Sequence, residues 1–135
     1  MVRILIVDDK ELVRSGLKML LERHVGWAIC GEAADGSEAI EKAVELQPDI
    51  ILLDIAMPNL DGLSACRMIR EKVPSSDILI LTILQSLELA RIAADSGAWG
   101  YVSKDVLGRD LISTIEAMTK HPITEEPVLD PNLNS

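Results

Sequence analysis

The sequence predicts an α/β fold, in which helices cover both faces of an open, doubly wound sheet of five parallel strands. Two patterns predict it: short apolar runs without polar alternation, and helical stripes of apolar residues between them. A third observation, a polar residue at the end of each central run, predicts where a site would lie.

Three central strands are predicted at residues 3–7, 49–53 and 78–81, each of them rich in Ile, Leu and Val. Continuous apolar runs are typical of strands that are covered on both faces, as in a parallel sheet. Residues 27–32 and 99–103 are less apolar and are predicted to form strands that flank the central three.

Helices are predicted between the strands, because apolar residues recur there at helical spacing. The predicted helical residues are, in chain order, Val13, Leu17, Leu20, Leu21 and His24; Ala39, Ile40, Ala43 and Val44; Leu63, Cys66 and Ile69; residues 86–95; and Leu107, Leu111, Ile115 and Met118. The fourth helix has the weakest stripe, and Gly97 is expected to close it as a left-handed cap.

Five β–α units in succession predict one domain over residues 1–120. Periodicity does not fix the order of the strands, but it places any site in the crevice beyond their carboxyl ends. Residues 121–135 hold three of the six prolines together with acidic residues, and are expected to be a tail or the start of a linker.

Composition and charge narrow the class of protein. The chain has 135 residues, no Phe, two Trp and one Tyr, so its core is expected to be aliphatic. A formal charge of −9 argues against direct binding to nucleic acid. No apolar run approaches the ~20 residues of a membrane span, and no signal-peptide pattern opens the chain. Cys30 and Cys66 lack metal or disulfide spacing and are expected to be reduced and buried, which together predicts a cytoplasmic protein.

The polar residues at the predicted strand ends suggest a chemistry. Asp8 and Asp9 follow the first strand, Asp54 the third, Thr82 ends the fourth and Lys104 follows the fifth. Carboxylates sharing one crevice repel each other unless a cation intervenes, and Mg²⁺ prefers such oxygen ligands. A lysine and a hydroxyl add donors for phosphoryl oxygens, so the set predicts phosphoryl transfer to a carboxylate.

These residues sit in motifs that resemble the receiver domain of bacterial two-component response regulators, over residues 2–119. The matching motifs are Asp8-Asp9, residues 52–62 (LLDIAMPNLDG), Leu81-Thr82 and residues 97–104 (GAWGYVSK). A lone aspartate is common, whereas this ordered combination is specific. The resemblance implies a flavodoxin-like fold with strand order 2-1-3-4-5.

The resemblance also implies roles for the site residues. Asp54 would be the phosphoacceptor for a partner sensor histidine kinase. Asp9 would bind Mg²⁺ directly, Asp8 would support it through water, and the backbone carbonyl of Ala56 would be a further ligand. Such a protein catalyses only its own phosphoryl transfer and dephosphorylation.

Switching is implied as well. Thr82 would hydrogen-bond the phosphoryl group, Lys104 would pair with it, and Tyr101 would be the aromatic residue whose ring moves inward. The family further implies homodimerisation on phosphorylation, through faces of the first, fourth or fifth helix.

Several positions depart from the common family pattern. Asp105 follows Lys104 where many receivers have proline, which is more like the receivers that precede LuxR-type (NarL/FixJ-like) DNA-binding domains. Ile83 is bulky and could narrow access for the phosphodonor, while Ala56 and Leu84 offer no polar group to a hydrolytic water. An acyl phosphate of at least moderate lifetime is therefore expected.

The sequence leaves open how the phosphorylated receiver would act on other molecules. A LuxR-type effector would need ~60 further residues with a recognition helix and a basic face, and nothing after Lys120 supplies either. The chain is either the receiver of a transcription factor or a stand-alone receiver that acts through protein contacts.

The same residues allow other interpretations. Asp8 with Glu11 could form a helix capping box. A haloacid-dehalogenase-like phosphatase needs a second aspartate two residues after the first, where this chain has Lys10 or Glu11, and a nucleotide- or flavin-binding domain needs a different first loop. A phosphorylation-independent interaction module is the main alternative. His24 and His121 lack neighbours suited to a metal site.

Overall fold

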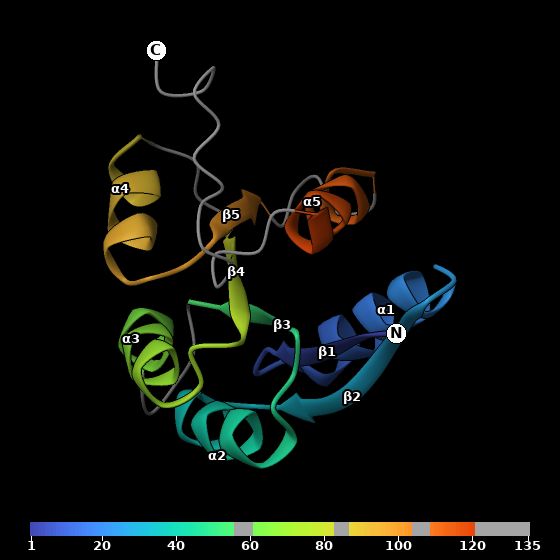
Figure 1. Cartoon of the computed structure of the whole chain (residues 1–135), viewed down its shortest axis with the longest axis horizontal. Helices are drawn as coiled ribbons and strands as arrows, with labels where there is room; N and C mark the ends of the chain where they lie inside the picture. The colour runs from blue at the N-terminus through green and yellow to red at the C-terminus, as the bar shows by residue number, and fades with distance from the viewer. Residues whose placement is uncertain (56–60, 83–86, 104–108, 121–135) are drawn as a thin grey trace.

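The computed structural model of the chain describes residues 1–55, 61–82, 87–103 and 109–120. Within these ranges strands and helices alternate (Figure 1). In chain order the elements are β1 (Val2–Val7), α1 (Glu11–Glu22), β2 (Trp27–Ala33), α2 (Gly36–Leu46), β3 (Ile50–Asp54), α3 (Gly62–Lys72), β4 (Asp77–Thr82), α4 (Leu87–Asp95), β5 (Gly100–Ser103) and α5 (Arg109–Lys120). The predicted alternation is confirmed, each central strand differing by one residue or two at its ends.

The strands form one parallel sheet in the order β2-β1-β3-β4-β5. This is the order implied by the resemblance. The chain crosses from β2 over β1 to β3, so the strand order reverses between β1 and β3. Ligands of such sheets bind beyond the carboxyl ends of the strands at this point of reversal.

Two apolar layers sandwich the sheet, because neighbouring residues of each central strand point to opposite faces. Ile4 and Ile6 of β1 pack with α1 and α5, whereas Leu5 and Val7 pack with α2, α3 and α4. Figure 1 shows the same division, with α1 and α5 on one side of the sheet and the other three helices opposite. As expected the core is aliphatic, with Trp27 as its one large aromatic side chain among the described buried residues.

Helix ends agree with local chemistry. Asp35 caps α2 by accepting a hydrogen bond of 2.8 Å from the Glu38 backbone N–H. Gly97 follows α4 with φ of +93°, which confirms the left-handed cap. Gln47 adopts a left-handed conformation at the end of α2, where its N–H donates to the Ala43 carbonyl.

One expectation about burial was wrong, and one residue of a predicted helical stripe faces solvent. Val44 is 48 % exposed, because Ala39 and Ala43 form the contact stripe of α2 and the next residue turns about 100° away. Cys30 is only half-buried. It lies at a bulge, since Ile4 pairs with Ile29 while Leu5 pairs with Gly31, and an unpaired bulge residue leaves the regular alternation of the strand.

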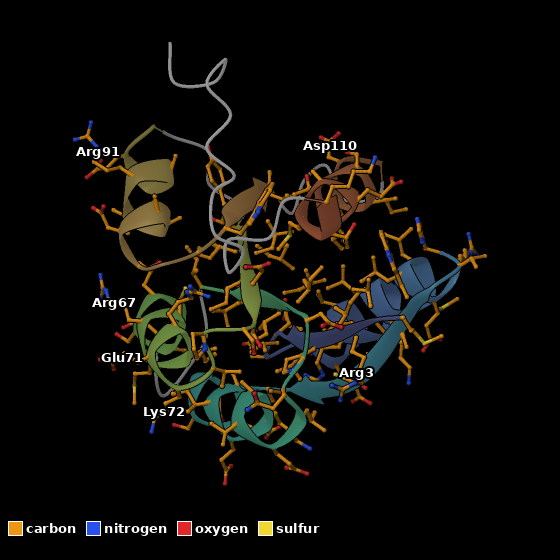
Figure 2. The ribbon with its side chains drawn as sticks, viewed as in Figure 1. Arg3, Arg67, Glu71, Lys72, Arg91 and Asp110 are labelled. Atoms are coloured by element: carbon orange, nitrogen blue, oxygen red, sulfur yellow. The ribbon has the colours of Figure 1, made fainter. Side chains whose placement is uncertain are left out.

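Charged side chains lie on the outer surfaces of the helices. Figure 2 shows Arg67, Glu71 and Lys72 pointing away from the sheet on α3, and Asp110 at the start of α5, all of them exposed. Both signs are interspersed on α3, so this helix does not offer a purely basic face. Of the helices in the described ranges, none combines the length and the apolar character that crossing a bilayer requires.

Candidate functional site

The register of the sheet brings the predicted residues of three strands to one edge. Asp8 directly follows Val7, which pairs with Leu53 of β3. Asp54 is the last residue of β3 and pairs with Leu81, and Thr82 is the last residue of β4. Parallel strands in this register end side by side, so these polar residues lie together at the carboxyl edge of the sheet.

The carboxylates of Asp8, Asp9 and Asp54 come together there. One oxygen from each lies within 4.8 Å of the others. Asp8 is fully buried, Asp54 is 2 % exposed and Asp9 is exposed, so the cluster opens to solvent on the Asp9 side. Charges this close repel strongly when buried, and a cation among them removes the repulsion. Three hard oxygen donors at one rim fit Mg²⁺ in particular, which keeps several waters and takes few carboxylates.

The backbone around Asp8 holds its side chain in place. Its N–H donates to the Ala33 carbonyl at 3.1 Å, and its carboxylate accepts from the Lys10 N–H at 2.9 Å. Its carbonyl oxygen accepts a hydrogen bond of 2.7 Å from Nη1 of Arg14. The N-cap of α1 is Lys10, without a side-chain cap bond, so the capping-box interpretation of Asp8 and Glu11 is wrong.

The start of α3 supports the other side of the site. Asp61 caps the helix by accepting a hydrogen bond of 2.8 Å from the Ser64 N–H, and this bond lowers the pKa of the Asp61 carboxyl group. Gly62 then packs so tightly that an added Cβ would lie 2.6 Å from the Asp54 carbonyl oxygen and would overlap Cα of Ile55. A glycine is therefore required where α3 meets the strand that carries Asp54.

The two residues expected to respond to phosphorylation lie on β4 and β5. Thr82 is buried, and it pairs with Ser103 across the strands. Tyr101 is half-buried, pairs with Ile80, and packs against the apolar layer beneath α2, α3 and α4. The expected roles of Lys104 and the Ala56 carbonyl, and the features predicted at Ile83, Leu84, Asp105 and His121, lie outside the described residues.

The sequence patterns missed Arg14 and Glu32. Nε of Arg14 donates to Oε1 of Glu32 at 3.1 Å, while its Nη1 holds the Asp8 carbonyl. Its side chain is only 16 % exposed, which is unusual for an arginine on a surface helix. The weak signal in the sequence is its place within the first turns of a helix that begins beside the acidic pair.

The histidine and cysteine residues of the described chain do not extend the acidic cluster. His24 stacks on Trp27 with ring centroids 3.6 Å apart and lies 3.9 Å from a Glu116 carboxylate oxygen. Cys30 and Cys66 are free thiols, and burial raises the pKa of each, so both stay protonated near neutral pH. Within the described residues, neither the histidine nor the two cysteines belong to a second group of side chains that could hold a metal.

Comparison with known proteins agrees with this geometry. The chain is 40% identical over 125 residues to the transcriptional regulatory protein YdfI of Bacillus subtilis (strain 168), covering 93% of this chain and 58% of the relative. A crystal structure of a LuxR-family two-component response regulator from Aurantimonas sp. SI85-9A1 is 40% identical, with a TM-score of 0.83 over 87% of this chain and 84% of that one. The response regulator domain of Thermotoga maritima CheB is 30% identical, with a TM-score of 0.81 over 94% and 99% of the two chains.

The curated relatives are longer than this chain, which spans little more than half of their length. These relatives are named as transcriptional regulatory proteins. The Aurantimonas protein is of the LuxR family, in agreement with the resemblance drawn from Lys104-Asp105. Residues 4–116 match the response regulator receiver domain. The chain therefore belongs to the response regulator receiver domain family of two-component systems.

Proposed function

We propose that this receiver accepts a phosphoryl group on Asp54 from a partner sensor histidine kinase and changes conformation in response. The observation that carries the proposal is the convergence of Asp8, Asp9 and Asp54, whose carboxylate oxygens lie within 4.8 Å of one another. Asp54 is the member that ends a central strand of the sheet, flanked by β1 and β4. Its position favours Asp54 as the nucleophile. Asp8 and Asp9, which lie between β1 and α1, are then favoured as holders of the metal.

Mg²⁺ is the proposed cofactor. Asp9 and Asp54 would hold it directly and Asp8 through water, with the Ala56 carbonyl as a further ligand. When bound, the ion supplies positive charge that offsets the charge on the transferring phosphoryl oxygens. The exposure of Asp9 at the rim supports entry of the ion from solvent.

The proposed transfer is a single displacement at phosphorus. A carboxylate oxygen of Asp54 forms a bond to phosphorus while the bond between phosphorus and the kinase histidine nitrogen breaks. The electron pair stays on that nitrogen, which takes up a proton, and Asp54 becomes an acyl phosphate. Later attack by water returns the carboxylate and inorganic phosphate, so the domain acts only on its own phosphoryl group.

Thr82 and Lys104 are the proposed partners of the phosphoryl oxygens. Thr82 ends the strand beside Asp54, so its hydroxyl needs little movement to donate to the new group. Movement of Thr82 would open space for the ring of Tyr101, whose half-buried position over the apolar layer supports a change of rotamer. In this way a local charge becomes a change of surface at β4 and β5.

The proposed output is homodimerisation that controls transcription through an effector domain, in the cytoplasm. The transcriptional relatives support this, because they are longer than the segment that matches this chain. A formal charge of −9 argues that DNA would be contacted by the effector and not by this domain.

Acetyl phosphate with Mg²⁺ tests the proposal without the kinase. Intact-mass measurement should show one added phosphoryl group on the wild type and none on Asp54→Asn, because the amide is a poor nucleophile. The same reaction without Mg²⁺ should be much slower. Light scattering on the same samples should show a larger mass for the phosphorylated wild type only.

A matched control is Asp49→Asn, which removes a carboxylate at the opposite, amino end of the same strand. It should accept phosphate at the wild-type rate. Modification of neither the wild type nor the control would contradict the proposal and favour a phosphorylation-independent interaction module on the same fold.

A further inference from the structure

We propose that Arg14, held by Glu32, is a positioning residue for the acidic site: it fixes the peptide between Asp8 and Asp9 and so sets the spacing of their carboxylates. The inference deepens the proposed function and rests on it. Arg14 is not itself one of the proposed metal ligands; it acts through the backbone next to them.

Arg14 binds a backbone oxygen of the acidic site. Nη1 of Arg14 donates to the backbone carbonyl of Asp8 at 2.7 Å. That carbonyl belongs to the peptide unit joining Asp8 to Asp9, and a peptide unit is planar. Fixing the carbonyl therefore fixes the N–H of Asp9 and the direction in which the chain leaves Asp8. Rotation of this plane would move the Asp9 carboxylate relative to that of Asp8.

The guanidinium of Arg14 is itself held in place by Glu32. Nε of Arg14 donates to Oε1 of Glu32 at 3.1 Å, and Glu32 lies on β2 opposite Ile6 of β1. The planar fork thus joins α1, the end of β1 and β2. A lysine would match the two acceptors less well, since its three donors share one nitrogen and lack the fixed planar spacing of Nε and Nη1.

The side chain of Arg14 is also largely shielded from solvent. The Arg14 side chain is 16 % exposed, whereas Glu32 is 39 % exposed. A surface ion pair by itself contributes little to stability, so the pair alone does not explain an arginine with so little of its side chain exposed. A charge-assisted bond to a backbone carbonyl beside two metal-ligand candidates does explain it, because that backbone must resist the repulsion of its own carboxylates.

The sign of one measurement separates positioning from simple charge. Arg14 brings positive charge toward an anionic site, so loss of its charge alone should strengthen the binding of Mg²⁺. Loss of positioning should weaken it. For Arg14→Gln we expect Mg²⁺ affinity of the full chain, measured by calorimetry, to fall on the order of 10-fold, as for other residues that orient metal ligands.

Phosphorylation by acetyl phosphate gives a second readout. The Mg²⁺ concentration for half-maximal rate should rise by a similar factor in Arg14→Gln, while the rate at saturating Mg²⁺ recovers most of its wild-type value. A variant that is merely less stable would show a lower unfolding midpoint without this shift in half-saturation. Arg14→Lys should recover the Mg²⁺ affinity only in part.

Two further variants serve as controls. Arg23→Gln removes one positive charge about 13 Å further along the same helix, beyond the ~8 Å screening length at physiological salt, and should leave Mg²⁺ binding unchanged. Glu32→Gln should weaken binding less than Arg14→Gln does. It should have no further effect in the Arg14→Gln background, because Glu32 acts through Arg14.

Several results would overturn the inference. Wild-type or tighter Mg²⁺ affinity in Arg14→Gln would do so, and so would full recovery in Arg14→Lys, since a point charge would then suffice. These outcomes leave the proposed function intact as long as the wild type is phosphorylated. A wild type that neither binds Mg²⁺ nor accepts phosphate would overturn both.

Discussion

Asp9 is the exposed residue of the acidic cluster, and its charge acts in two opposing ways. Without a cation it repels Asp8 and Asp54, whose oxygens lie within 4.8 Å. With Mg²⁺ bound it is a proposed direct ligand of the ion. The same carboxylate should therefore destabilise the free protein and stabilise the loaded one.

Asp9→Asn tests this balance. In chelator at neutral pH, we expect its free energy of unfolding to rise by about 1 kcal/mol, the size of a Coulomb term at such distances in a wet site. With millimolar Mg²⁺ the wild type should gain stability as a ligand-binding protein does, whereas Asp9→Asn should gain little. Thermal unfolding with and without Mg²⁺ measures both effects.

Glu41→Gln is the matched control, because Glu41 is exposed on α2 away from the strand-end edge. It should respond to Mg²⁺ as the wild type does. A fall in the unfolding midpoint of Asp9→Asn in chelator would contradict the proposed repulsion.

At the scale of elements, the start of α3 couples helix stability to the proposed phosphoacceptor, Asp54. The Asp61 cap and the close approach of Gly62 place this helix against the backbone of Asp54 and Ile55. The site therefore depends on a helix terminus as well as on strand ends.

Asp61→Ala should lower the free energy of unfolding by about 1 kcal/mol at pH 7, because the Ser64 N–H loses its acceptor. Asp61→Asn should lose only a few tenths, since its carbonyl still caps the helix. The bond from Ser64 lowers the pKa of Asp61, so the folded state binds this proton less tightly than the unfolded state. The cap's charge-dependent part is then complete above the ordinary carboxyl pKa and is lost as pH falls through the lowered value.

Urea unfolding of the three proteins at pH 7 and at lower pH measures this. The difference between wild type and Asp61→Asn should shrink on acidification, while the amide cap itself does not titrate. Equal stabilities of Asp61→Ala and wild type at pH 7 would show that the cap contributes nothing.

At the scale of the whole molecule, the strength of the switch can be bounded. Two charge-assisted hydrogen bonds, from Thr82 and Lys104, would supply about 1.5–3 kcal/mol each. Moving a two-state equilibrium from 1:99 to 99:1 takes about 5.5 kcal/mol. Together the two bonds supply about 3–6 kcal/mol, which reaches that value only at the upper end. We therefore expect the unphosphorylated protein already to sample the active form.

Relaxation-dispersion NMR should detect that minor state in the unmodified protein, at the backbone of β4 and β5. Asp54→Asn should show it too, since sampling does not need the phosphoryl group. Thr82→Ala should change its population, because the hydroxyl is a proposed part of the switch. Flat dispersion profiles at Thr82 and Tyr101 in the unmodified protein would argue that phosphate creates the active form without prior sampling.

Local patterns carried much of the fold and part of the site. The apolar runs ending in Asp8, Asp54 and Thr82 predicted both the parallel sheet and the edge where these residues meet, and the register confirms that edge. The absence of metal or disulfide spacing predicted a buried Cys30, but a bulge in β2 leaves it half-buried. Val44 follows the helical spacing of α2 and is nevertheless 48 % exposed, because a spacing pattern does not fix which edge of the stripe meets the core.

By itself the sequence determined which side-chain groups stand at the strand ends, namely carboxylates, a hydroxyl and an amine. These groups set the kind of chemistry that is available there. Periodicity left the strand order open, and the resemblance supplied it. Tertiary structure decided what periodicity cannot carry, namely the approach of three carboxylate oxygens to within 4.8 Å and the hold of Arg14 on the Asp8 carbonyl. Those contacts join residues from different elements, and their geometry depends on register and helix packing that no local pattern encodes.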